Sequence, residues 1–198
     1  MRVLIDAGHG KETPGKRSPD GTFREYLFNR NVAELLAQEL RLKGIPVAMI
    51  TPEEADVPLA ERCRRANDWA SRERCVFVSM HANAAGNGSA WMGAKGWSCY
   101  TSVGRTAADE VAECLYDAFE KEFPDRRIRE DKSDGDRDWE ANFYVLKHTT
   151  CPAVLLENFF YDNQEECRWL LTHSAQIRIA RATADGLMRY FRKKGLIS

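Results

Sequence analysis

The chain has 198 residues, of which 43% are hydrophobic and 30% charged, and this composition suits one soluble domain with a sizeable core. Its formal net charge of −1 excludes the strong positive charge that marks proteins binding nucleic acids or anionic membranes. We therefore expect a single domain over residues 1–198 that recognises its partner by shape and local chemistry.

The six cysteines are widely and irregularly spaced, and no Cys-x-x-Cys pair occurs. This spacing argues against a zinc site made of cysteines, and a domain of this size needs no disulfide bridges, so free buried thiols are expected. The first residues lead directly into an apolar strand without the pattern of a signal peptide, and no apolar run could span a bilayer. We expect synthesis in a reducing compartment, and either action inside the cell or release by a route other than a standard signal.

Short apolar strands alternate with amphipathic helices along the chain. A strand begins at residue 3, and a loop rich in Gly and Pro follows at 11–21. Further strands are predicted at 46–51, 76–81, 97–101, 144–146 and 153–157, and helices at 29–43, 58–70, 107–123, 164–172 and 175–193. This alternation predicts an α/β fold, with a mostly parallel sheet covered by helices on both faces. The segment 125–140 is rich in charges of both signs, which favours a solvated loop; a flexible flank of the functional site is the alternative.

Two histidines stand at the ends of predicted strands. His9 follows the first strand and lies between Gly8 and Gly10, and His81 ends the strand at 76–81. A single histidine in such a place is commonly structural. Two of them are better explained as metal ligands, because the strand ends of an open α/β sheet meet at one edge and imidazole is a preferred ligand of zinc.

Two glutamates complete a candidate site. A catalytic zinc usually takes three protein ligands, and Glu25 is the best candidate for the third, although an acidic residue at a helix start is also favourable for structural reasons. Glu157 ends a buried apolar strand, where a carboxylate has to pair, bind a metal or transfer protons. Beside a zinc ion it would act as the general base of a hydrolase and then pass the proton to the leaving amine. A structural salt bridge is the alternative.

Four short motifs lie along nearly the whole chain: IDAGHG at 5–10, LAER with a following AN between residues 59 and 67, SMHAN at 79–83, and VLK followed by PAVLLE between residues 145 and 157. Taken together and in this order, they resemble the zinc-dependent N-acetylmuramoyl-L-alanine amidases of the type 3 family. The resemblance implies a six-stranded fold, one zinc ion bound by His9, Glu25 and His81, and Glu157 as the catalytic acid and base. It also implies hydrolysis of the amide between N-acetylmuramic acid and L-alanine in peptidoglycan.

The chain departs from the family pattern at two places. The last block reads ENFF at 157–160, where family members commonly read Glu-x-Gly-Phe. We expect the bulky Phe159 to narrow the site or to change which stem peptide is accepted. The first loop, at 11–19, replaces a shorter Gly-Gly-x-Asp-x-Gly, and Lys16 and Arg17 within it are expected to bind substrate carboxylates.

These features lead to one main hypothesis, a monomeric zinc amidase that lyses or remodels the cell wall. The chain has no long insertion before the strand at 153–157 and no wall-binding repeat, which is typical of a phage or prophage lysis enzyme (an endolysin) or of a minimal autolysin. Within the motifs, Asn83 and Asn158 are further expected contacts of the peptidoglycan substrate. Two alternatives remain, a zinc peptidase that cuts within the stem peptide and a wall-binding module without catalytic activity.

Overall fold

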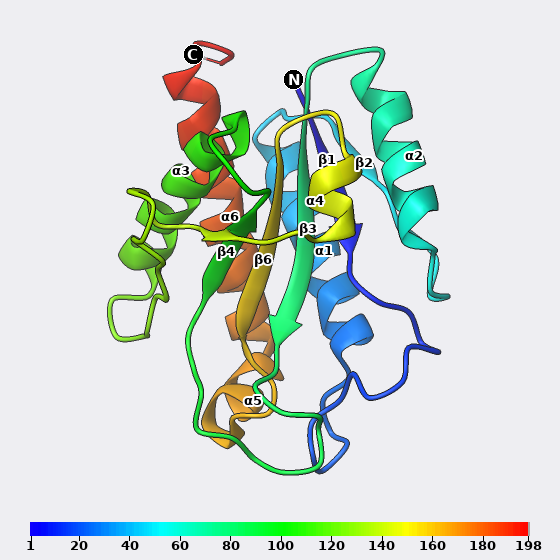
Figure 1. Ribbon diagram of the computed structural model, residues 1–198, viewed down its shortest axis with the longest axis vertical. Coiled ribbons are helices and arrows are strands. Elements are labelled where there is room, and N and C mark those ends of the chain that lie inside the picture. The colour runs from blue at the N-terminus through cyan, green and yellow to red at the C-terminus, as the bar shows by residue number, and fades with distance from the viewer. Residues whose placement is uncertain (198) are drawn as a thin grey trace.

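One mixed sheet forms the centre of the computed structural model, which describes residues 1–197. Its strands are β1 (Arg2–Ala7), β2 (Val47–Met49), β3 (Cys75–Asn83), β4 (Ser98–Thr101), β5 (Trp139–Glu140) and β6 (Ala153–Phe160). They lie in the order β2-β1-β3-β6-β4-β5, and all neighbours are parallel except β4 and β6 (Figure 1). The expected α/β fold with a mostly parallel sheet of six strands is therefore confirmed.

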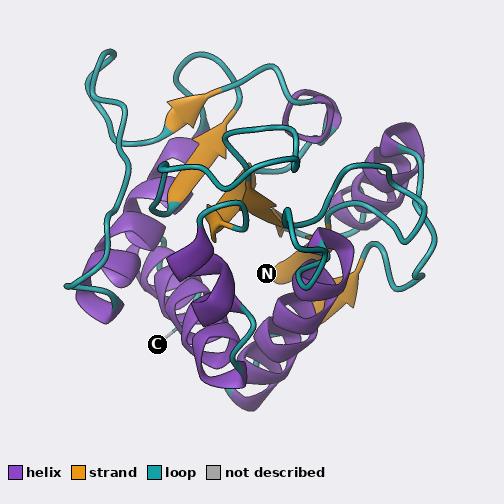
Figure 2. Cartoon of the chain, turned by 90° about the horizontal axis from the view of Figure 1, so that it is seen from below, coloured by secondary structure: helices purple, strands orange, loops and turns teal. Residues whose placement is uncertain are grey.

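Helices cover both faces of the sheet in two unequal layers, which Figure 2 shows from the end of the strands. The larger layer is formed by α1 (Glu25–Leu42), α3 (Ala107–Glu122), α5 (Gln164–Leu170) and α6 (His173–Lys193). The smaller layer is formed by α2 (Leu59–Ala70) and α4 (Tyr144–His148). Successive residues of a strand point to opposite faces, so Leu156 packs in the larger core and Leu155 in the smaller one.

The strand directions determine where polar side chains gather. Strands β1, β3 and β6 are neighbours and run parallel, so their carboxyl ends meet at the same edge of the sheet. His9 follows β1, His81 lies near the end of β3, and Glu157 lies opposite it on β6. The predicted gathering of these three side chains at one edge follows from this topology.

Several elements differ from the sequence expectations. Residues 144–146 belong to helix α4 and not to a strand; a single helical turn carries Val145 and Leu146 into the smaller core, and so short an apolar run cannot distinguish the two structures. Helix α1 begins at Glu25 rather than near residue 29. The charged segment 125–140 is only partly a solvated loop, because it contains the edge strand β5 and the buried Asp138.

The cysteines agree with the sequence analysis. All six are free thiols, and every one except Cys151 is buried. Within residues 1–197, no helix has both the length and the apolar character that crossing a membrane requires.

Phe159 adopts a left-handed backbone conformation, with a φ of 65°, and its side chain is fully buried. The ring packs edge-on against Phe123 and Trp169, at centroid distances of 5.5 and 4.8 Å. It belongs to the larger core, on the face of the sheet opposite to Glu157. Regular alternation along the strand would place residues 157 and 159 on the same face, so the left-handed backbone at Phe159 is what turns the ring into the larger core. The expectation that Phe159 narrows the site is therefore wrong. A positive φ also explains why glycine suits this position in the family pattern.

Replacing Phe159 by glycine tests which of two opposed effects is larger. Glycine removes the backbone strain, worth about 1–2 kcal/mol, but it also removes a buried aromatic ring, worth about 3–5 kcal/mol. We expect Phe159→Gly to lower the free energy of unfolding by about 2 kcal/mol and the melting temperature by about 4–8 °C. Phe159→Ala keeps the strain and loses the ring, so it should be less stable than Phe159→Gly. Calorimetry that found the glycine variant at least as stable as the wild type would contradict this account.

Candidate metal centre and catalytic cleft

Close approaches on both sides of His9 leave no room for a side chain at either neighbouring residue. A Cβ atom at Gly8 would overlap the His81 ring, and a Cβ atom at Gly10 would overlap the backbone that precedes α2, so both positions require glycine. His9 itself has a left-handed backbone, with a φ of 62°. The Arg30 guanidinium donates a hydrogen bond of 2.9 Å to the His9 carbonyl and thereby holds this conformation.

Glu25, the first residue of α1, is only 1% exposed. Its Oε1 lies 3.1 Å from Nδ1 of His81 and 3.4 Å from Nε2 of His9. Its Oε2 is buried without a hydrogen-bond partner, and Lys16 Nζ lies 3.8 Å from it. Burial acts to raise the pKa of Glu25, but hydrogen bonds and charge from His81 and His9 hold that pKa well below its usual range. A carboxylate anion is thus buried between two imidazoles.

The two imidazoles differ in their surroundings. Burial lowers the pKa of His9 below its ordinary value and outweighs the opposite effect of Glu25. Burial also acts to lower the pKa of His81, but Glu25, and then Glu157, raise it above its ordinary value. The rings are nearly perpendicular, with centroids 4.9 Å apart. Despite these different surroundings, each ring directs one nitrogen toward the Glu25 carboxylate.

His9, Glu25 and His81 form a suitable set of ligands for a metal ion. One ligand atom from each residue lies within 4.8 Å of the other two. Two imidazole nitrogens and one carboxylate oxygen are a donor set that zinc takes in catalytic sites with three protein ligands. The free Oε2 of Glu25 agrees with this role, because a buried carboxylate oxygen normally has a partner.

Glu157 is placed directly opposite His81 by the register of β3 and β6. Burial raises the pKa of Glu157 to about 7; the Glu25 carboxylate adds to this effect, whereas His81 and Lys16 oppose it. Its Oε2 has no hydrogen-bond partner. A carboxyl group that titrates near neutral pH and has a free oxygen is suited to accept and release a proton.

A cleft of about 630 Å³ connects these groups. His9, Lys16, His81 and Glu157 line it with polar atoms. The smaller helical layer and the sheet supply an apolar part, formed by Val57, Pro58, Leu59, Phe143, Tyr144, Val145 and Leu155. The cleft therefore joins a candidate metal centre and a proton-transfer group to a surface that can hold an organic substrate.

A buried network beside the cleft was not predicted from the sequence. Arg62 of α2 is 2% exposed and donates a hydrogen bond of 3.1 Å to Asp6, which also accepts one of 2.6 Å from Ser79. Arg62 bonds to the Ala7 carbonyl as well. The network fixes α2 against the ends of β1 and β3. A signal was present in the sequence, because a carboxylate within an apolar strand needs a buried partner.

Two of the expected substrate contacts have other positions. Asn158 points to the face of β6 opposite to Glu157 and is fully buried. Its Nδ2 donates to the His81 carbonyl at 2.9 Å, and its Oδ1 accepts from the Trp97 indole at 3.2 Å. This corrects the expectation: Asn158 positions the His81 backbone and, being fully buried outside the cleft, cannot contact a substrate there. Asn83 lies beyond a break in the strand register, accepts the N–H of the next residue at 2.8 Å, and does not line the cleft.

The two basic residues of the first loop are separated by the structure. Lys16 lines the cleft together with Glu157. Arg17 does not, but it lines a second pocket that shares Lys16 with the cleft. Only Lys16 is therefore adjacent to the candidate metal centre.

Substituting Gly8 by alanine tests the candidate metal centre. The new methyl group would occupy the space of the His81 ring, so we expect Gly8→Ala to displace this ring and to lower zinc affinity at least tenfold. Gly93→Ala is a matched control, since its Cβ would meet open space and its φ is not positive. Zinc binding is measured by calorimetry on metal-free protein. Equal zinc affinity in Gly8→Ala and the wild type would show that the His81 ring is not a ligand.

Comparisons with known proteins agree with this geometry. A family model described as N-acetylmuramoyl-L-alanine amidase matches residues 3–189. An N-acetylmuramoyl-L-alanine amidase of Bacillus licheniformis is 29% identical over 192 residues, which cover 96% of this chain and 69% of the relative. The endolysin of Bacillus phage SPP1 is 30% identical over 190 residues, which cover 93% of this chain and 64% of the relative.

A solved structure is similar over its full length. The crystal structure of an N-acetylmuramoyl-L-alanine amidase from Clostridium difficile 630 has a TM-score of 0.86 and 28% identity, with 98% of both chains covered. The fold is thus shared with this amidase, and the family model spans most of the sequence. The chain belongs to the N-acetylmuramoyl-L-alanine amidase family.

Proposed function

We propose that the chain is a zinc-dependent N-acetylmuramoyl-L-alanine amidase in which His9, Glu25 and His81 hold the metal and Glu157 is the catalytic acid and base. Family membership supports the reaction, hydrolysis of the amide between N-acetylmuramic acid and L-alanine in peptidoglycan. The observation that carries the assignment of roles is the register of β3 and β6, which sets Glu157 opposite His81 beside the three ligands. The catalytic domain extends over residues 1–198, and its place of action is the cell wall.

The mechanism follows from the positions of these side chains. A zinc ion held by the three ligands would polarise the scissile carbonyl. Glu157 accepts a proton from the attacking water as the new C–O bond forms, and donates it to the L-alanine nitrogen as the C–N bond breaks. Its pKa of about 7 suits both steps, because the group is then easily ionised and easily protonated near neutral pH.

The apolar part of the cleft has a separate role in this proposal. Three large side chains of apolar character are between 39% and 49% exposed, namely Leu59, Phe143 and Tyr144. They line the same cleft as Glu157, so a substrate would cover them. Their burial by the substrate would exclude water from the reacting amide and would strengthen its interactions with the charged groups.

Two other functions are less well supported. A zinc peptidase acting within the stem peptide would use similar ligands, but the family match favours cleavage at the muramic acid amide. A wall-binding module without activity would not need a buried carboxyl group with a free oxygen beside three metal ligands. Such a group is costly to bury and is explained by catalysis.

Substitution of Glu157 by glutamine tests the proton-transfer role. Glutamine keeps the shape of the side chain but cannot transfer a proton, so we expect kcat to fall by about 10²–10⁴-fold while the protein still binds zinc. Glu34→Gln on the exposed surface of α1 serves as the control. Mass spectrometry of digested muropeptides is the measurement, and release of intact stem peptides identifies an amidase, whereas shortened stems identify a peptidase. Normal turnover by the glutamine variant would disprove the assigned role.

A further inference from the structure

A second pocket beside the cleft has four basic residues among the nine that line it. This loop pocket has a volume of about 320 Å³ and is formed by residues 11–17, Arg24 and Tyr26, which belong to the segment between β1 and the first turn of α1. Its charged members are Lys11, Glu12, Lys16, Arg17 and Arg24. Four cations thus face one carboxylate, in a chain whose net charge is only −1. The positive charge is therefore a local feature.

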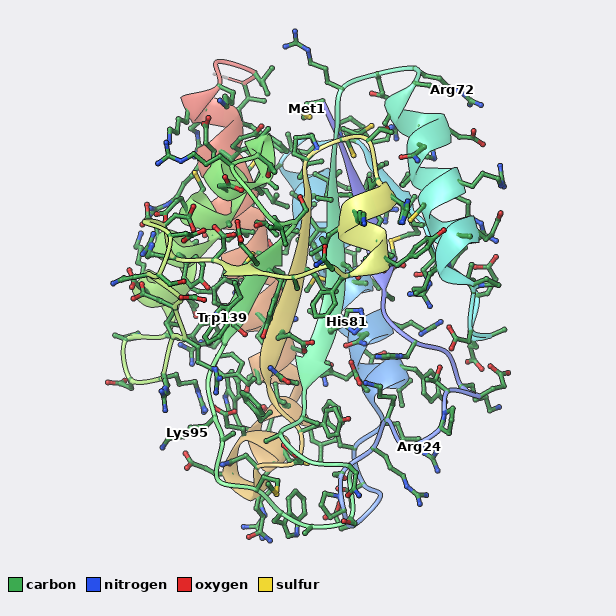
Figure 3. All side chains as sticks on the ribbon, in the orientation of Figure 1. Met1, Arg24, Arg72, His81, Lys95 and Trp139 are labelled. Atoms are coloured by element: carbon green, nitrogen blue, oxygen red, sulfur yellow. The ribbon has the colours of Figure 1, made fainter. Side chains whose placement is uncertain are left out.

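The loop pocket is adjacent to the catalytic cleft because Lys16 lines both. Lys16 Nζ lies 3.8 Å from Oε2 of Glu25, one of the proposed zinc ligands. In Figure 3 Arg24, which directly precedes α1, lies below and to the right of His81. A substrate whose scissile amide lies at Glu157 can therefore extend one of its ends past Lys16 toward the loop pocket.

The positive charge of the loop pocket is only partly neutralised by the protein, because Lys16 pairs with Glu25 whereas the other three cations have no such partner in the part of the chain that the structure describes. Within residues 1–197, the side chains of Lys11, Arg17 and Arg24 form no ion pair or hydrogen bond. The carboxylate of Glu12 is already engaged by the backbone N–H of Asp56, at 3.2 Å. Arg137 differs from these unpaired cations, because its single guanidinium contacts three carboxylates, those of Glu113, Asp117 and Glu120.

The backbone places two of these cations against each other. Arg17 and Arg24 are partners in an isolated antiparallel bridge, and both are exposed. Like charges in directly opposite positions of an antiparallel pair are destabilising. The neighbouring residues of the two segments are also bonded, since the Lys16 carbonyl accepts the N–H of Glu25 at 3.0 Å. Glu25 is a proposed zinc ligand, so the two arginines lie next to the proposed metal centre along the chain. An anion bound between the two arginines would relieve their repulsion and would lie close to the site.

The substrate provides an anion at a suitable place. In peptidoglycan the stem residue after L-alanine is a glutamate linked through its side chain, so its α-carboxyl group is either a free carboxylate or an amide. Resting on the function proposed above, we propose that the loop pocket binds this carboxylate and makes the enzyme favour stem peptides in which it is free. Arginine suits the task because its guanidinium pairs with a carboxylate through two parallel hydrogen bonds.

The inference is tested by binding of the cleaved stem peptide, which requires no turnover. Two synthetic tetrapeptides are compared on the zinc-loaded protein by calorimetry, one with the free carboxylate on its second residue and one with the amide. The wild type is expected to bind the free acid about tenfold more tightly. The variant Arg17→Ala with Arg24→Ala should bind the two peptides equally. Both side chains are exposed and unpaired, so this variant should fold and melt at or above the wild-type temperature.

Control measurements separate this inference from its alternatives. Arg105→Ala removes one exposed and unpaired arginine outside the loop pocket, and it should keep the tenfold preference. Equal binding of the two peptides by the wild type would overturn the inference, even if the protein cleaves peptidoglycan. A preference that survives in the double variant would overturn it too. If the double variant lost affinity only for whole walls rich in phosphate polymers, the pocket would recognise a wall polyanion and not the stem peptide.

Discussion

The site depends on one buried carboxylate, Glu25, which lies between two imidazoles. An ionised carboxyl group in the protein interior is costly unless charge and hydrogen bonds compensate it. His9 and His81 provide both for one oxygen, and the other oxygen is left without a hydrogen bond. This arrangement is only half satisfied by the protein alone, and a divalent cation with a preference for nitrogen and oxygen ligands would complete it. The chemistry of the proposed enzyme is thus already present in the electrostatics of three side chains.

Backbone contacts keep the two histidines in place, and they come from residues that do not touch the reacting groups. Arg30 bonds to the His9 carbonyl, and Asn158 bonds to the His81 carbonyl from the opposite face of the sheet. The absence of a side chain at Gly8 lets the His81 ring lie directly over the end of β1. Precise positioning of metal ligands by such supporting contacts is a common requirement of catalytic metal sites.

The sequence predicted which side chains gather at the strand ends, and it failed for residues whose position depends on the direction of the side chain. The gathering of His9, His81 and Glu157 was predictable because parallel strands bring their carboxyl ends to one edge. Asn158 was misassigned although the twofold alternation along a strand directs it away from Glu157. The helix at Tyr144–His148 depends on contacts between distant segments, which local patterns do not record. The position of Asp6 in an apolar strand signals that it needs a buried partner, but the local pattern does not identify Arg62 as that partner.

Two non-glycine residues with a positive φ, His9 and Phe159, show that backbone strain has more than one cause. At His9 the strained backbone directs an imidazole toward Glu25, and Arg30 stabilises it through the carbonyl. At Phe159 no reactive group is involved, and the strain is offset by a ring packed between Phe123 and Trp169. Strain at His9 is therefore informative about function, because no core packing explains it, whereas strain at Phe159 is explained by the core.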